Sequence, residues 1–325
     1  MKPKVFVTKP IPLEALELLK ERCEVEMNTE ERTLPKDELL TKMKDRDAIL
    51  VVSTPMDEEI FKNVSHQCKI FANHGVGYNH IDVDAATKYG FWVSNTPDAV
   101  IDATADLTWA LLLSAARRIS ECDPFVRAGK KGWGATNLLA SHVSGKTLGV
   151  IGGGRIGTAV AERAKGFKMK IIYTDVQPCQ PFEAATGGQY TDKETLLKEA
   201  DFITLHVPLL PATRHLISEP ELKMMKKTAI LINAARGPIV DEKALVAALK
   251  AGEIKGAGLD VFEREPNLEP GLAELPNVVL TPHVGTSTLD ARVEMGNTCA
   301  RNIFAALDGQ MPPDCLNPQA KEHHN

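Results

Sequence analysis

The chain has 325 residues, which corresponds to about two domains of ordinary size. Apolar residues make up 43% of it and charged residues 25%, as in folded globular proteins, so a disordered chain is excluded. The net charge of −5, without a long basic run, argues against nucleic-acid binding. No apolar run approaches the roughly 20 residues that span a bilayer, so we expect no membrane association.

The six cysteines are widely spaced and form no Cys-x-x-Cys pair. We therefore expect reduced thiols in a cytoplasmic protein, without a disulfide framework and without a metal site.

Short apolar runs alternate with amphipathic stretches along the first hundred residues. This alternation is typical of parallel β/α units. The predicted helices include Leu13–Glu21 and Lys36–Met43. The predicted strands are Lys4–Thr8, Val25–Met27, Ala48–Val52, Ile70–Asn73 and Trp92–Ser94.

A long helical stretch at Ala99–Ile119 separates this region from a second series of strands. Six strands with helices between them predict a doubly wound sheet, so the chain holds two α/β units, the second of which forms a compact insert. A last helix, Thr288–Leu307, ends before Gly309. The six predicted strands are Thr147–Ile151, Lys170–Thr174, Phe202–His206, Ala229–Asn233, Gly256–Asp260 and Val278–Thr281.

A glycine-rich turn directly follows the first strand of the second series. Gly152 lets the chain turn sharply, Gly154 lets the backbone approach a pyrophosphate, and Gly157 allows close packing of a helix on the strand. The residues Thr158–Lys165 are predicted to form that helix, whose N-terminus attracts phosphates. The pattern predicts a dinucleotide-binding site.

Asp175 stands at the end of the next predicted strand, about 20 residues beyond the turn, where a carboxylate bonds the adenosine ribose hydroxyls. A carboxylate there repels a 2′-phosphate, which favours NAD, as NADH, over NADPH. The alternative interpretation is a packing turn with an Asp that caps it.

Polar side chains follow the remaining strands, whose carboxyl ends meet at one edge of the sheet. Arg236 has the planar guanidinium group that binds the carboxylate and carbonyl oxygen of a 2-oxo acid. His283 can donate a proton to that oxygen as hydride arrives, and Glu265 favours the charged imidazolium. Each residue alone is more easily explained as structural, but the three together beside a dinucleotide turn favour catalysis.

Two further strand-end residues have less definite roles. His206 competes with His283 as the acid, but it lies nearer the glycine turn in strand order, so we assign it to the surroundings of the cofactor. Asp260 is expected to bond the nicotinamide carboxamide or to orient a neighbouring residue.

Four ordered segments resemble those of the D-isomer-specific 2-hydroxyacid dehydrogenases, among which the glyoxylate and hydroxypyruvate reductases are the most similar. The resemblance implies that Arg236, Glu265 and His283 are the catalytic residues. It also implies two Rossmann-like doubly wound domains: a substrate domain of residues 1–99 and 287–325, and an NAD-binding domain of residues 100–286 inserted into it. The segments are Gly152–Gly157, Ile232–Asp241 (INAARGPIVD), Gly258–Pro266 (GLDVFEREP) and Thr281–Thr286 (TPHVGT).

The same resemblance assigns further contacts and a homodimer joined through Ile101–Trp133. The amides of Val76 and Gly77, in the segment Asn73–Asn79 (NHGVGYN), would face the substrate carboxylate, although an ordinary strand-to-helix turn has the same pattern. Thr108 can equally well bond its own helix backbone. The cofactor contacts implied by the family are Thr108, Arg155, Ile156, Val207, Thr213, Ala234, Arg236, Asp260, His283 and Gly285.

The sequence departs from the family pattern at three places. Lys168 replaces a glycine that usually precedes Met169, and Ala135 interrupts a short Trp-x-Pro pattern. Pro55 lies near a loop that often carries a basic residue facing the substrate, which puts the identity of the acid in doubt. Two other functions share this fold: a corepressor-type protein that senses NADH, and a dehydrogenase that oxidises phosphite.

Overall fold

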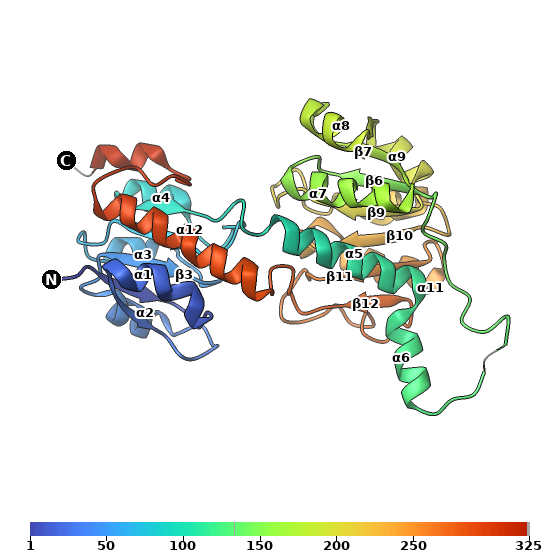
Figure 1. Cartoon of the computed structure of the whole chain (residues 1–325), viewed down its shortest axis with the longest axis horizontal. Coiled ribbons are helices and arrows are strands. Elements are labelled where there is room, and N and C mark those ends of the chain that lie inside the picture. Colours follow the sequence, from blue (N-terminus) through green and yellow to red (C-terminus); the bar gives the residue numbers. More distant parts are fainter. Residues whose placement is uncertain (133, 324–325) are drawn as a thin grey trace. The chain divides into compact units, whose positions relative to one another are not determined.

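The computed structural model describes residues 1–132 and 134–323, and it divides the chain into two compact units. The first unit comprises residues 1–100 and 286–325, and the second comprises residues 101–285. Both chain ends therefore belong to the first unit (Figure 1). Trp133, which ends the region expected to join two subunits, lies outside the described residues.

The first unit is built on a five-stranded parallel sheet in the order β2-β1-β3-β4-β5. All five predicted strands are present, with bounds that differ by no more than one residue. The strands are β1 (Lys4–Val7), β2 (Glu24–Met27), β3 (Ala48–Val51), β4 (Ile70–Asn73) and β5 (Trp92–Ser94).

The helices of this unit cover both faces of its sheet, because neighbouring residues of each strand point to opposite sides. Val5 and Val7 pack into one apolar cluster and Phe6 into another, and all three are fully buried. The predicted helix Leu13–Glu21 is a 3-10 turn followed by a short α-helix. The helices are η1 (Leu13–Leu16), α1 (Glu17–Arg22), α2 (Lys36–Met43), α3 (Glu58–Asn63), α4 (Val83–Lys88), α12 (Leu289–Leu307) and η4 (Pro318–His323).

The second unit is built on a seven-stranded parallel sheet in the order β12-β11-β10-β9-β6-β7-β8. This is a doubly wound order, since the chain reverses direction across the sheet between β6 and β9. The six predicted strands are present; β8 was not predicted because its two exposed residues form no apolar run. The strands are β6 (Thr147–Ile151), β7 (Lys170–Thr174), β8 (Gln189–Tyr190), β9 (Phe202–Leu205), β10 (Ile230–Asn233), β11 (Gly256–Leu259) and β12 (Val278–Leu280).

Two predicted helices of this unit have different bounds in the structure. The stretch predicted as one helix, Ala99–Ile119, ends at Arg117 because Arg118 adopts a left-handed conformation with φ +57°. The helix predicted at Thr158–Lys165 begins earlier, at Arg155, with Gly154 as its N-cap. The helices are α5 (Ile101–Arg117), α6 (Ile119–Arg127), α7 (Arg155–Ala164), η2 (Lys165–Phe167), α8 (Gln180–Thr186), α9 (Lys193–Glu199), α10 (Glu219–Met224), η3 (Gly237–Ile239) and α11 (Glu242–Ala251).

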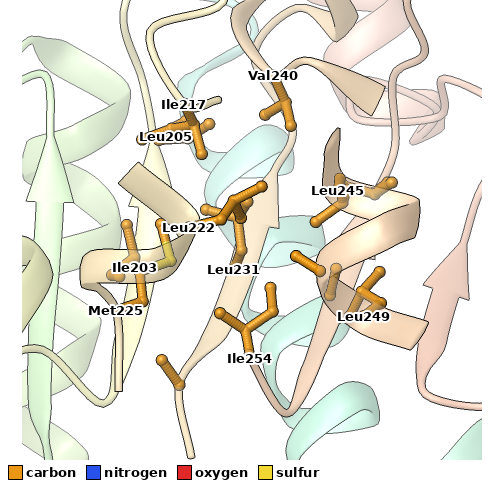
Figure 2. Packing of buried hydrophobic residues seen from close by; sticks show 14 of the residues in the cluster. Ile203, Leu205, Ile217, Leu222, Met225, Leu231, Val240, Leu245, Leu249 and Ile254 are labelled. Atoms are coloured by element: carbon orange, nitrogen blue, oxygen red, sulfur yellow. The ribbon is translucent and has the colours of Figure 1, made fainter. Parts of the chain in front are cut away.

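The core of the second unit explains why its strands are almost continuously apolar. Ile203 and Leu205 of β9, with Leu231 of β10, face α10 and α11, whose apolar side chains meet them (Figure 2). Phe202 and Ile230, on the same two strands, face the opposite cluster, which includes α5 and α7. Both faces are buried, so this sheet presents its carboxyl edge for binding.

No helix in the described part of the chain has the length and apolar character needed to cross a membrane. Within residues 1–132 and 134–323, no three His, Cys, Asp or Glu side chains are grouped so that they could hold a metal ion.

Candidate functional site

The glycine turn joins β6 to α7, and two of its three motif glycines are required by the protein itself. Gly152 has φ +102°, and a Cβ there would lie 2.7 Å from the His206 carbonyl group. A Cβ on Gly157 would lie 2.1 Å from the carbonyl oxygen of Gly152. These two glycines let the turn pack against the neighbouring strand end and against its own helix.

Gly154 differs from the other two, because a Cβ at this position would meet no protein atom within 4 Å. Its φ of −71° is also open to any residue. Packing therefore does not require glycine here, whereas close approach of a ligand to the backbone does. The residue caps α7, whose first-turn amides have no acceptor inside the helix. The turn fits the pyrophosphate of a dinucleotide.

Asp175 follows β7 and is held beside the glycine turn. Its Oδ2 accepts from the amide of Gly153 at 2.8 Å, and its Oδ1 accepts from the amide of Val176 at 2.7 Å. The side chain is half-buried and keeps lone pairs for another donor. It thus performs the capping role and remains available to the hydroxyls of a ribose.

His206 follows β9, next to the backbone of Gly152. Its Nε2 and the Thr204 hydroxyl are 2.8 Å apart, and desolvation lowers the pKa of His206 to about 3. A histidine that is neutral at physiological pH is a poor source of protons, which is consistent with its assignment away from the acid role.

Arg236 lies just beyond β10, on a loop that a buried asparagine holds in shape. Asn233 accepts from the amide of Ala235 at 3.0 Å and donates to the carbonyl of Arg236 at 2.9 Å. Burial lowers the pKa of the Arg236 guanidinium, and the charge of Glu265 acts against that shift. Asn233 was not predicted as a site residue; its position at a strand end and inside the segment Ile232–Asp241 were the signals.

The glycine after Arg236 brings two strand-end loops into contact. A Cβ on Gly237 would lie 1.9 Å from the carbonyl carbon of Phe262 and 2.5 Å from the amide nitrogen of Glu263. Only a residue without a side chain fits there, so the Arg236 loop rests directly on the turn that carries Glu265.

Glu265 and His283 form a side-chain hydrogen bond across two neighbouring strand ends. Glu265 Oε2 lies 2.8 Å from His283 Nδ1, and Glu265 Oε1 accepts from the amide of Phe262 at 2.9 Å. Burial raises the pKa of the Glu265 carboxyl, but His283, the Phe262 amide and the charge of Arg236 together shift it below its usual value. The carboxylate is therefore ionised, and the His283 side chain is half exposed.

Asp260 follows β11 and supports the loop that carries His283. Its carboxylate accepts from the Thr281 hydroxyl at 2.6 Å and from the amides of Val284 and Gly285 at 2.8 Å each. Its carbonyl accepts from the amide of His283, which has φ +55°. Of the two roles expected for Asp260, the structure displays the orienting one.

A cavity of about 350 Å³ lies beside Glu265 and His283, within the second unit. Glu265 and His283 line it together with mostly apolar side chains, including Leu268 and Leu280. The cavity therefore offers a mostly apolar wall beside these two polar side chains.

The other residues expected around a cofactor differ in their accessibility. Ile156, Val207, Thr213 and Ala234 are half-buried, and Arg155 is exposed. The Thr213 hydroxyl donates to the Pro208 carbonyl at 2.6 Å within its own loop. Thr108 is 0% exposed and its hydroxyl donates to the Thr104 carbonyl at 2.8 Å, so it bonds its own helix and offers no surface to a ligand.

In the first unit, the loop after β4 has its carbonyl groups engaged and two of its amides unpaired. Asn73 donates to the carbonyls of Gly75 at 2.8 Å and Gly77 at 3.0 Å, and Asn95 donates to that of Val76 at 2.9 Å. Among the described residues, nothing accepts from the amides of Val76 and Gly77. Half-buried amides without acceptors form a site for an anion. Neither asparagine was predicted as a site residue, although Asn73 begins the segment that the family resemblance singles out; only its strand-end position pointed to Asn95.

Dinucleotide-dependent oxidoreductases are the class of protein in which such a turn and such an acid–base pair share one sheet edge. A family model described as "D-isomer specific 2-hydroxyacid dehydrogenase, NAD binding domain" matches residues 109–285. The glyoxylate reductase of Thermococcus litoralis is 49% identical over 323 residues, which cover 98% of this chain and 97% of that protein.

Solved structures give the same result. A glyoxylate reductase from Paecilomyes thermophila has a TM-score of 0.87 at 34% identity, covering 98% of this chain and 99% of that one. An NADPH-dependent glyoxylate/hydroxypyruvate reductase from Sinorhizobium meliloti has a TM-score of 0.87 at 31% identity, covering 99% and 98%. The chain belongs to the D-isomer specific 2-hydroxyacid dehydrogenase family, as the sequence motifs predicted, and is an oxidoreductase with an NAD-binding domain.

Proposed function

We propose that this protein reduces small 2-oxo acids, with glyoxylate as the principal substrate and hydroxypyruvate as a second, using NADH. The observation that carries the proposal is the 2.8 Å contact between Glu265 Oε2 and His283 Nδ1, on the sheet edge that also bears the glycine turn. The substrate is inferred from the relatives named glyoxylate reductase, such as that of Pyrococcus furiosus, which is 48% identical.

In this proposal three residues of the second unit carry the chemistry. NADH supplies the hydride when bound. His283 Nδ1 is engaged by Glu265, so His283 Nε2 donates the proton to the carbonyl oxygen of the substrate. The charged guanidinium group of Arg236 binds the substrate carboxylate and polarises the substrate carbonyl. The residues proposed to hold NADH are Gly152, Gly154, Arg155, Ile156, Gly157, Asp175, Val207, Thr213, Ala234, Arg236, Asp260, His283 and Gly285.

The first unit, residues 1–100 and 286–325, is proposed as the substrate domain. The unpaired amides of Val76 and Gly77 support this role, since they would bind the substrate carboxylate without adding a charged side chain.

The test of the function is a steady-state assay of a panel of 2-oxo acids with NADH and with NADPH. We expect the highest kcat/KM with glyoxylate and measurable turnover of hydroxypyruvate. Absence of turnover across the panel would contradict the proposal. Two further measurements probe other functions of the fold, namely reduction of NAD⁺ by phosphite and NADH-dependent binding of peptides.

The preference for NADH over NADPH rests on Asp175, whose carboxylate repels a 2′-phosphate. We expect Asp175→Ser to lower the ratio of kcat/KM for NADH to that for NADPH by about tenfold, the effect of one like-charge contact at a partly exposed site. Asp192→Ser, an exposed aspartate that caps α9, is the matched control. A wild-type enzyme that uses NADPH as well as NADH would contradict this preference.

We further propose that the enzyme is a homodimer joined through Ile101–Trp133. Helix α6 in this region has no buried residue, and Ile119 and Val126 are more than half exposed. We expect sedimentation to give a dimer for the wild-type protein and a monomer for Val126→Glu. A monomeric wild-type protein would contradict the proposed dimer.

We also propose a reducing, cytoplasmic location. Three buried free thiols, Cys23, Cys68 and Cys299, support this location, which fractionation of cells tests.

A further inference from the structure

A buried glutamate lies next to the turn that carries Glu265 and belongs to none of the motifs that define the family resemblance. Glu242 is the first residue of α11 and only 2% exposed. Its Oε1 accepts from the backbone amide of Glu263 at 2.6 Å. Its Oε2 is buried, and the described residues give it no hydrogen-bond partner.

Burial at this position is energetically unfavourable for an ionised carboxyl group. Burial raises the pKa of Glu242; the backbone amides of Glu263 and Glu269 oppose this shift, and the nearby carboxylates of the same two residues add to it. An apolar side chain would fill the same space at less cost. The one contact that Glu242 makes with the turn therefore indicates what the carboxyl group contributes.

That contact reaches Glu265 through two residues of backbone. Glu263 follows Phe262, whose amide is bound by Glu265 Oε1, and Glu265 Oε2 meets His283. Gly237 presses on the other side of the same turn, at the Phe262 carbonyl. The turn at residues 262–265 is thus held by backbone packing on one side and by Glu242 on another.

Charged side chains around the turn do not replace Glu242. Glu263 is paired with His215 at 2.7 Å and with Arg214 at 3.4 Å, while Arg264 is paired with Glu269. These pairs engage side chains, and their basic partners are exposed to solvent, so each is worth little. The bond from Glu242 is the buried one, and it engages the main chain.

We propose that Glu242 is a positioning residue for the acid–base pair: it holds the turn at residues 262–265 so that Glu265 stays against His283. The inference rests on the proposed function, because it assumes that this pair transfers the proton.

The test compares Glu242→Leu, which removes the acceptor, with Glu242→Gln, which keeps an oxygen acceptor. We expect Glu242→Leu to lower kcat for glyoxylate by about 10- to 100-fold, as a small displacement of a catalytic group does. The pH at which kcat/KM falls to half should also move downward, since a displaced Glu265 supports the charged His283 less. We expect Glu242→Gln to stay within about threefold of wild type.

Two controls separate positioning from stability. Glu219→Leu changes the first residue of α10, an exposed glutamate paired with Lys223, and should leave kcat and the pH profile unchanged. NADH affinity, measured by fluorescence, should be unchanged in the Glu242 variants. A merely structural role would lower the melting temperature and leave the pH profile of the folded enzyme in place.

A folded Glu242→Leu enzyme with wild-type kcat and pH profile would overturn the inference. A loss of kcat in Glu242→Gln as large as that in Glu242→Leu would also overturn it. If Glu242→Leu does not fold, Glu242→Asp, which withdraws the carboxylate by one methylene, is judged by the same outcomes. A His283→Ala enzyme that keeps wild-type kcat would overturn the proposed function instead. Loss of activity in His283→Ala with an unaffected Glu242→Leu overturns only the role of Glu242.

Discussion

The two units present opposite kinds of chemistry at the carboxyl edges of two similar parallel sheets. In the second unit, charged side chains project from the strand ends, and other side chains hold their loops, as Asp260 holds the His283 loop with three bonds. In the first unit, the loop after β4 offers neutral amides at Val76 and Gly77, while Asn73 engages the carbonyl groups.

This difference teaches that the fold does not determine the chemistry, because both sheets gather loops at the same edge. It also predicts that substitutions divide into two classes. Those in the second unit should mainly affect the chemical step, and those in the first should mainly affect the binding of the substrate anion.

The largest expected effect is that of His283→Ala, which removes the proton donor. We expect kcat to fall by about 10²- to 10⁴-fold with NADH affinity largely kept, because the imidazole acts in the transition state. Arg236→Ala should lower kcat and also raise the KM for glyoxylate. Stopped-flow and steady-state kinetics measure both, with His142→Ala, an exposed histidine of the same unit, as control. Near-full activity of His283→Ala would contradict the assignment of the chemical step to the second unit.

A smaller effect of the opposite kind is expected from Asn73→Ala in the first unit. The variant frees the carbonyls of Gly75 and Gly77, so the loop no longer holds its two amides ready for an anion. We expect the KM for glyoxylate to rise by about tenfold, the worth of one buried hydrogen bond, with a smaller change in kcat. Asn63→Ala, an exposed asparagine that ends α3, is the control. If kcat fell and KM did not change, the two edges would not differ as described.

The smallest effect is expected at Lys168, which precedes β7 at the opposite edge of the sheet. Lys168 is exposed and adopts φ +54°, a backbone conformation that favours glycine. We expect Lys168→Gly to raise the free energy of unfolding by about 0.5–1 kcal/mol, because the left-handed strain exceeds the added flexibility of the unfolded chain. Lys165→Gly, at φ −59°, should lower it instead. Denaturant unfolding measures the free energy of unfolding of both variants, and their kcat and KM should not change. A lower free energy of unfolding in Lys168→Gly would contradict the claim that Lys168 is strained.

Much of the site was visible in the sequence for local reasons. The strand, the glycine turn and Asp175 occur within thirty residues of each other, and their spacing is set by the backbone geometry of one β/α unit. The start of α7 was misplaced at Thr158 because glycines seldom begin a helix, whereas here Gly154 caps it. The long helix at Ala99–Ile119 was overextended because the left-handed turn at Arg118 has no glycine to mark it.

The sequence by itself determined the parallel α/β class, the order of its strands along the chain, and which polar residues follow them, since alternation and strand ends are local properties. Only the tertiary structure decided which of those residues meet. The 2.8 Å contact of Glu265 with His283, the fit of Gly237 on the Phe262 carbonyl, and the bond from Glu242 to the Glu263 amide all join separate loops. Their partners depend on how the strands are ordered across the sheet, and no local pattern of residues carries that order.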